Sequence, residues 1–267
     1  FDVHENVPAQ ILGKGYLPWW SRRLMSVGYA ALERILIGRI DAVIAATPSI
    51  ADQYRSFHQR VEHVANYPII DEFESAAKDR GPGASVCFVG GITKARGIAQ
   101  LVRALALTRS GARLKLAGRF ISDDDRVSVS GNPGWSFVEE LGYLNRGEVR
   151  SVLAESVAGI VTYLPEPNHV NAMPNKLFEY MSAGLPVIAS DFPVWREIVE
   201  SNNCGICVDP ADPQAIAAAV DELVSNPPLA ARLGRNGRVA IERRYNWGSE
   251  AQKMFAMYEH LARPVSA

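Results

Sequence analysis

The sequence predicts an α/β fold built on parallel β-sheets, and two observations carry this prediction. Short apolar runs alternate with amphipathic helical patterns along most of the chain, which is typical of βαβ units. With 48% hydrophobic and 21% charged residues, the composition is that of a folded globular protein. The length of 267 residues exceeds that of a usual single domain but is short for two complete ones. We therefore expect one complete α/β domain preceded by part of another.

Residues 1–68 form the first expected block. Its opening residues, Phe1–Glu5, resemble the end of a strand, and Asp41–Ala46 is a second, apolar strand. Thr47 and the proline after it are typical of the start of a helix. Val61–Ala65 is a further short strand. The next residues, 69–84, are polar and rich in glycine and proline, so we expect an interdomain linker there.

Residues 85–246 show the strand–helix alternation most regularly. The expected strands are Ser85–Val89, Leu114–Ala117, Phe137–Val138, Gly159–Tyr163, Pro186–Ala189 and a short segment within Asn203–Asp209. The expected helices are Ile98–Thr108, Gly147–Ala154, Pro174–Ala183, Val194–Val199, Pro213–Ser225 and Ala230–Arg244. A last helix begins at Trp247, and we expect residues 247–267 to cross back and pack on the first block.

Charge and cysteine content exclude several classes of protein. The chain has 28 Lys and Arg residues against 29 Asp and Glu residues, a formal net charge of −1. This balance excludes a disordered chain and gives no support to nucleic-acid binding through overall charge. Cys204 and Cys207 have C-x-x-C spacing but no second pair and no nearby histidines, so we expect buried, reduced structural thiols rather than a zinc site.

Two loops at expected strand ends are candidate anion sites, because open parallel sheets bind ligands at the carboxyl ends of their strands. In the first, Gly90 and Gly91 would let the backbone approach a phosphate, and Arg96 would supply positive charge. The loop matches neither the G-x-G-x-x-G pattern nor the P-loop, so a tight turn without a ligand is an equal alternative. The same mismatch argues against a dinucleotide-dependent oxidoreductase.

The second candidate is stronger and lies around the helix that begins at Pro174. Lys176 falls in the first turn of the helix, where its positive charge interacts unfavourably with the helix dipole. An anion bound at this helix end would explain a lysine in that position. Glu179 lies one turn beyond Asn175, so both can face one cleft. A carboxylate there can accept hydrogen bonds from both hydroxyls of a ribose.

One segment indicates contact with a surface. Trp19 and Trp20 stand beside Arg22 and Arg23, a mixture that suits a membrane interface with anionic lipid. The alternative is a helix that packs its tryptophans into a core. The sequence has no run of about 18 apolar residues that would span a membrane. We expect a cytoplasmic protein, with attachment to the inner face of the cell membrane through this segment as the alternative location.

The acidic run Asp123–Asp125 is the one candidate for a metal site in the sequence. It has no partner ligand nearby, and we interpret it as a solvated loop. No metal and no resident cofactor are expected.

The sequence from Pro174 to Ser190, PNKLFEYMSAGLPVIAS, resembles the donor-site signature of the family-4 retaining glycosyltransferases, which have the two-domain GT-B fold. The similarity continues through Cys204–Pro210, Asn236–Gly237 and Tyr245–Trp247. The resemblance implies that residues 85–246 are a complete, Rossmann-like nucleotide-sugar-binding domain. Residues 1–68 would then be a Rossmann-like remnant of an N-terminal acceptor domain that lacks most of its length.

The resemblance also implies roles for single residues. Glu179 matches the second glutamate of the family's glutamate pair and would bind the ribose, whereas the first glutamate is replaced by Asn171. The family's phosphate-binding cations match Gly91 and Arg96, so the diphosphate would depend on Arg96, Lys176 and backbone N–H groups. The implied catalytic residues are His4, Arg96 and Lys176, with His4 facing the donor sugar. The implied donor-binding residues are Gly90, Gly91, Tyr143, Asn171, Met173, Pro174, Asn175 and Glu179, with Tyr143 next to the base.

The expected function is transfer of a hexose-type sugar from a nucleoside diphosphate, such as UDP, to a glycan or lipid-linked acceptor. Transfer would retain the anomeric configuration, need no metal, and serve the assembly of a polysaccharide. Two alternatives stay open. One is a nucleotide-sugar 2-epimerase, which Lys176 and Glu179 disfavour. The other is a nucleotide-sugar-binding fragment without catalytic activity, because so little of an acceptor domain is present.

Overall fold

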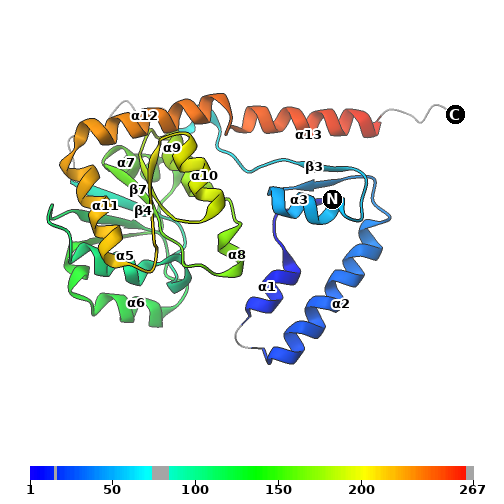
Figure 1. Cartoon of the computed structure of the whole chain (residues 1–267), viewed down its shortest axis with the longest axis horizontal. Coiled ribbons are helices and arrows are strands. Elements are labelled where there is room, and N and C mark those ends of the chain that lie inside the picture. The colour runs from blue at the N-terminus through cyan, green and yellow to red at the C-terminus, as the bar shows by residue number, and fades with distance from the viewer. Residues whose placement is uncertain (15–16, 74–83, 263–267) are drawn as a thin grey trace.

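The computed structural model describes residues 1–14, 17–73 and 84–262, and it contains two parallel β-sheets with helices packed around them (Figure 1). The α/β fold class expected from the sequence is confirmed. Part of the expected linker, residues 74–83, lies outside the described residues.

The first block has a three-stranded sheet in the order β1-β2-β3. Its strands are β1 (Asp2–Val3), β2 (Val43–Ala45) and β3 (Val61–His63), and its helices are α1 (Val7–Gly13), α2 (Trp19–Ile37) and α3 (Pro48–Arg55). Thr47 caps α3 by accepting a hydrogen bond from the Ile50 N–H, as its place before a proline predicts. A small core forms between this sheet and the helices, around Val43 and Tyr54.

The second block has a six-stranded parallel sheet in the order β6-β5-β4-β7-β8-β9. The strands are β4 (Ser85–Val89), β5 (Arg113–Ala117), β6 (Val138–Gly142), β7 (Ala158–Val161), β8 (Val187–Ser190) and β9 (Gly205–Val208). From β4 the chain moves outward in one direction to β5 and β6, and then returns to place β7 on the other side of β4. The carboxyl end of β4 is therefore the switch point at which doubly wound sheets bind their ligands.

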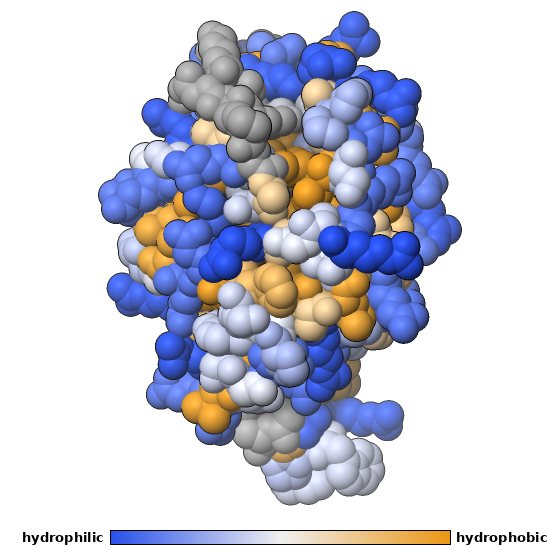
Figure 2. All heavy atoms as spheres, turned by 90° about the vertical axis from the view of Figure 1, so that its left-hand side faces the viewer, coloured by the Kyte–Doolittle hydropathy of each residue, from blue (hydrophilic) through white to orange (hydrophobic). Residues whose placement is uncertain are grey.

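Helices cover both faces of this sheet (Figure 1). They are α5 (Ile98–Leu105), α6 (Asp123–Ser130), α7 (Arg146–Ala154), α8 (Pro167–Val170), α9 (Asn175–Ser182), α10 (Pro193–Ser201), α11 (Pro213–Ser225) and α12 (Pro227–Arg243). Three short 3-10 turns complete the block, η1 (Ile70–Phe73), η2 (Lys94–Arg96) and η3 (Pro133–Phe137). On the outer face, turned away from the first block, hydrophilic side chains surround apolar ones (Figure 2).

The interpretation of Asp123–Asp125 as a loop is wrong. These three acids form the first turn of α6, which Ser122 caps by accepting a hydrogen bond from the Asp125 N–H. Negative charge in a first turn is favourable, because it faces the positive end of the helix dipole. Within the described ranges, no three His, Cys, Asp or Glu residues are grouped closely enough to hold a metal ion.

Packing of α9 against the sheet decides where the candidate donor residues lie. The ring of Tyr180 packs on Gly159 of β7, where an added Cβ would come within 2.2 Å of the ring. The Tyr180 hydroxyl accepts a hydrogen bond from the Val89 N–H at 2.9 Å, at the end of β4. This contact holds the first turn of α9 beside the switch point.

Cys204 directly precedes β9, Cys207 lies within it, and both are free thiols. Cys204 is fully buried, as expected, whereas Cys207 is only half-buried. Burial raises the pKa of each thiol to about 12, so both are unreactive at neutral pH.

The two blocks are joined at two places along the chain. Phe73 of η1 is fully buried in the core of the second block. After α12 the chain turns back into α13 (Trp247–Ala262), where the Trp247 N–H donates to the Pro68 carbonyl at 3.0 Å. Glu250 of α13 then accepts a hydrogen bond from the Ala65 N–H at 2.8 Å. Among the described helices, none is long and apolar enough to cross a bilayer.

Candidate active site

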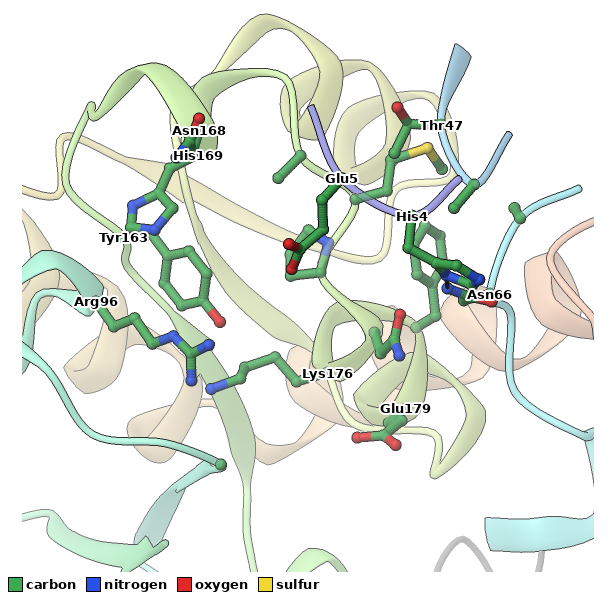
Figure 3. A pocket seen from close by; sticks show the side chains of 18 of the residues that line it. His4, Glu5, Thr47, Asn66, Arg96, Tyr163, Asn168, His169, Lys176 and Glu179 are labelled. Atoms are coloured by element: carbon green, nitrogen blue, oxygen red, sulfur yellow. Dashed lines mark hydrogen bonds between the residues drawn. The ribbon is translucent and has the colours of Figure 1, made fainter. Parts of the chain in front are cut away.

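A cleft of about 910 Å³ lies between the two blocks, at the carboxyl ends of β4 and β7 (Figure 3). The second block contributes its floor. The loops after β1, β2 and β3 and the helix α1 contribute the opposite wall. The helices α1 and α8 contact each other across one side of it. Segments that are distant in the sequence therefore meet at one site.

Two cations lie on the floor of this cleft, with their charged ends toward each other (Figure 3). Arg96 comes from η2, and its Nη1 donates to the Gly91 carbonyl at 2.8 Å. Lys176 comes from the first turn of α9 and is only 8% exposed. Its Nζ lies 3.8 Å from the centroid of the Phe88 ring. Two basic side chains placed side by side favour binding of an anion between them.

The glycines before Arg96 make room for these cations. A Cβ at Gly90 would lie 3.2 Å from Nζ of Lys176, and Gly90 has a left-handed φ of +116°. A Cβ at Gly91 would come within 2.8 Å of Nη1 of Arg96. The glycines were expected to admit a phosphate to the backbone. In the structure they also leave space for the two side chains that carry positive charge.

The N-terminus of α9 opens into the same cleft. Its N-cap is Pro174, which has no side-chain acceptor for the first N–H groups of the helix. Asn171, Met173 and Asn175 line the cleft around this turn. Helix α10 holds the preceding loop in place, because its residue Trp195 donates its indole N–H to the Ala172 carbonyl at 2.6 Å. The arrangement presents backbone donors beside Lys176.

Glu179 has a partner that the sequence analysis missed. Its Oε1 accepts a hydrogen bond from Nη1 of Arg146 at 2.8 Å, and Arg146 also donates through Nε to Glu72 at 2.7 Å. The guanidinium lies over the ring of Phe73, 5.0 Å from its centroid. Arg146 therefore links the carboxylate in the cleft to the segment that connects the two blocks. Its place one residue after the helix cap Asn145 gave no sign of this role.

His4 lies on the opposite wall, at the end of β1. Its Nε2 is 3.1 Å from Oδ2 of Asp2, and its Nδ1 is 2.9 Å from Nδ2 of Asn66. Next to it, the side chain of Glu5 extends toward the middle of the cleft (Figure 3). Neither Glu5 nor Asn66 was expected from the sequence, and only the meeting of the two blocks reveals them.

The remaining expected residues are placed less centrally. Tyr143 lines the cleft but is 70% exposed, and the Arg119 guanidinium lies 5.0 Å from its ring centroid. Gly91 does not line the cleft and contributes through its carbonyl. Tyr163, which was not expected, stands above Arg96 and Lys176 with its hydroxyl toward them (Figure 3).

Comparison with known proteins gives the family. The sequence model described as "Glycosyl transferases group 1" matches residues 83–226, more than half of the chain. The chain belongs to this glycosyltransferase family. The resemblance of its donor-site sequence to family-4 members is confirmed.

Curated relatives of this chain are longer than the chain itself. The MMP alpha-(1->4)-mannosyltransferase of Mycolicibacterium hassiacum is 23% identical over 258 residues, which cover 93% of this chain and 62% of the relative. An uncharacterized glycosyltransferase of Methanocaldococcus jannaschii is 27% identical over 177 residues, 65% of this chain and 44% of the relative. The chain thus spans about half the length of these two proteins.

Solved structures show the same fold. Sucrose-phosphate synthase from Thermosynechococcus elongatus superimposes with a TM-score of 0.76 at 22% identity, over 97% of this chain and 67% of that one. Anabaena HepE in complex with UDP superimposes with a TM-score of 0.74 at 16% identity, over 97% and 72%. The chain therefore has a partial GT-B fold, as expected from the sequence.

Proposed function

We propose that the cleft binds a nucleoside diphosphate sugar and that the chain transfers its hexose-type sugar to a glycan or lipid-linked acceptor. The observation that carries this proposal is the pair of cations, Arg96 and Lys176, beside the open N-terminus of α9 at the switch point. A diphosphate is the anion that suits two adjacent cations and a set of backbone N–H donors.

With the diphosphate at this position, the ribose, the base and the sugar of the donor would each reach a different part of the cleft. The carboxylate of Glu179 stands one turn along α9 and can accept from the ribose hydroxyls, while Tyr143 lies at the edge of the cleft for the base. Asn171 would contact the sugar with an amide, which hydrogen-bonds without adding negative charge. HepE was solved in complex with UDP, and we propose UDP as the nucleotide of the donor for this site as well.

Departure of the nucleoside diphosphate is the step that these residues would assist. Negative charge develops on the leaving phosphate, and fixed cations and N–H dipoles stabilise it without rearrangement. Arg96 and Lys176 can supply the positive charge for which other transferases use a metal ion, so we propose a metal-independent reaction. The acceptor hydroxyl would attack from the side of the leaving group, which retains the anomeric configuration, and the phosphate would take its proton. His4 lines the cleft from the first block, and we propose that it faces the donor sugar.

A second candidate function is binding of a nucleotide sugar without transfer. The three charged residues proposed to bind the donor, Arg96, Lys176 and Glu179, all belong to the second block. Release of UDP from a UDP-sugar on addition of an acceptor supports transfer, whereas tight binding without turnover supports a binding module.

We also propose that α2 contacts an anionic membrane surface in the assembly of a polysaccharide at the cytoplasmic face. The tryptophans do not pack into a core: Trp19 is 70% and Trp20 61% exposed, so that alternative is wrong. The same helix exposes the apolar side chains of Leu24 and Val27, with Arg23 beside Trp19. Sedimentation with vesicles containing phosphatidylglycerol should fall for a Trp19→Ser, Trp20→Ser variant; equal binding of both proteins would overturn the proposal.

The donor site is tested by calorimetry with UDP and GDP. We expect Arg96→Ala and Glu179→Ala each to weaken nucleotide binding by about 1–3 kcal/mol, the value of a lost charge-assisted hydrogen bond. Arg103→Ala and Glu197→Ala are matched controls on exposed helix positions outside the cleft. Unchanged affinity in both site variants would refute the assignment.

A further inference from the structure

Lys176 is a buried amine for which the chain provides no hydrogen-bond acceptor. Its side chain is 8% exposed, and Nζ has no hydrogen-bond partner in the part of the chain that the structure describes. Its nearest ring contacts are Phe88 at 3.8 Å and Tyr163 at 5.4 Å from Nζ to the centroid. Attraction to aromatic rings offsets only part of the cost of removing an ammonium from water.

The charged and titratable groups around Lys176 do not balance a positive charge. Arg96, from η2, faces it with the same sign. Glu179, on its own helix, has the opposite sign, but its carboxylate already accepts a hydrogen bond from Arg146. The Cys87 thiol of β4 also lies near Lys176. The phenols of Tyr163 and Tyr180 are close as well, and burial raises the pKa of both, so they are neutral at physiological pH.

An amine in such surroundings is more stable without its proton. Burial of an unpaired ammonium costs several kcal/mol, and a lysine avoids this cost by releasing the proton. Consistent with this geometry, burial and then the neighbouring Arg96 lower the pKa of Lys176 well below its ordinary value of 10.5.

We propose that Lys176 is neutral in the protein alone and takes up one proton when a diphosphate binds beside Arg96. The inference rests on the proposed function, because it needs an anion at this place. A bound diphosphate would supply what Nζ lacks in the protein alone, because it brings negative charge next to Nζ and offers oxygen atoms as hydrogen-bond acceptors. One proton moves from the solvent to Nζ on binding, and it returns when the nucleoside diphosphate leaves.

Proton uptake makes donor affinity depend on pH. Between the pKa of Lys176 in the free protein and its higher pKa in the complex, the binding constant should fall by up to about tenfold for each pH unit upward. Lys176 thereby carries its positive charge only when a phosphate is present whose oxygen atoms can accept hydrogen bonds from Nζ. This avoids the cost of holding a buried, unpaired ammonium next to the Arg96 guanidinium in the free cleft.

The test is calorimetry with UDP-glucose and GDP-mannose, whose diphosphates carry no ionising group between pH 7 and 9. Titrations in HEPES and in Tris, which differ in ionisation enthalpy and contain no phosphate to compete for the site, give the number of protons taken up. We expect uptake approaching one proton in the wild type. Lys176→Arg should keep most of the affinity without uptake, and Lys176→Met should lose about tenfold to a hundredfold in affinity and lose uptake as well.

Binding with the same heat in both buffers would overturn this inference and leave the proposed function standing. Uptake that persists in Lys176→Met would assign the proton to another group and overturn it too. A measurement without donor separates the two proposals further. In the protein labelled with ¹³C-lysine, the Cε signal that Lys176→Arg removes should report a neutral amine at pH 9; an ordinary titration near 10.5 would refute the inference whether or not a donor binds.

Discussion

Glu250 provides a direct test of how α13 is joined to the first block. Its side chain is 3% exposed although it is an acid, and its two oxygens have separate partners. Oε2 accepts a hydrogen bond from the buried Ala65 N–H at 2.8 Å, and Oε1 accepts one from Nζ of Lys253 at 2.7 Å. We expect Glu250→Ala to destabilise the first block more than the second.

The magnitude follows from these two contacts. Loss of the carboxylate leaves the Ala65 N–H buried without its acceptor, which costs about 1–3 kcal/mol. The bond to Lys253, which is 42% exposed, adds up to about 1 kcal/mol. The expected total of about 1–4 kcal/mol is a large part of the 5–15 kcal/mol that stabilises a typical domain.

Urea unfolding and limited proteolysis measure the effect. Cleavage within residues 1–68 should accelerate in Glu250→Ala. Glu250→Gln should lie between it and the wild type, because an amide oxygen can still accept from Ala65. Glu259→Ala, an exposed position on the same helix, is the control and should change little. A loss below about 0.5 kcal/mol in Glu250→Ala, equal to the control, would refute the argument that this carboxylate ties the helix to β3.

Three further outcomes are expected. His4→Ala should reduce sugar transfer while UDP affinity measured by calorimetry stays nearly unchanged, and an equal loss of both would contradict its place opposite the donor. Gly159→Ala should cost about 1–3 kcal/mol in urea unfolding, because its Cβ would overlap the Tyr180 ring, whereas Gly28→Ala meets no atom within 4 Å and should not destabilise. Burial lowers the pKa of His63 below 6.5, so the unfolded chain binds more protons in this range and stability should fall as the pH drops from about 7 to 5; His63→Phe should flatten that slope, and an unchanged slope would show that another group causes it.

Local sequence was sufficient for the elements of the second block. Pro213–Ser225 was predicted with the bounds that the structure shows, because proline after an N-cap residue and apolar residues at helical spacing are both local signals. Asp123–Asp125, expected in a loop, instead begin α6. The polar character of the run was given more weight than the N-cap that Ser122 provides.

Some residues of the candidate site could also be predicted from local sequence, and others could not. Arg96, Lys176 and Glu179 could be named from sequence because each lies at a strand end or in a helix turn with a recognisable pattern, and their roles toward a donor stay predictions. Arg146 could not be named, since its contacts with Glu179 and Glu72 join positions 33 and 74 residues apart.

The sequence by itself determined the parallel α/β fold and the family, and it predicted the loops at which a donor would bind, because periodicity, glycines and helix starts are local properties of the chain. Only the tertiary structure decided which groups surround each charged side chain in the cleft. Whether Lys176 has an acceptor depends on β4 and η2, and the partner of Glu179 depends on the start of α7. Such electrostatic effects act between side chains that only folding brings within a few ångströms of each other.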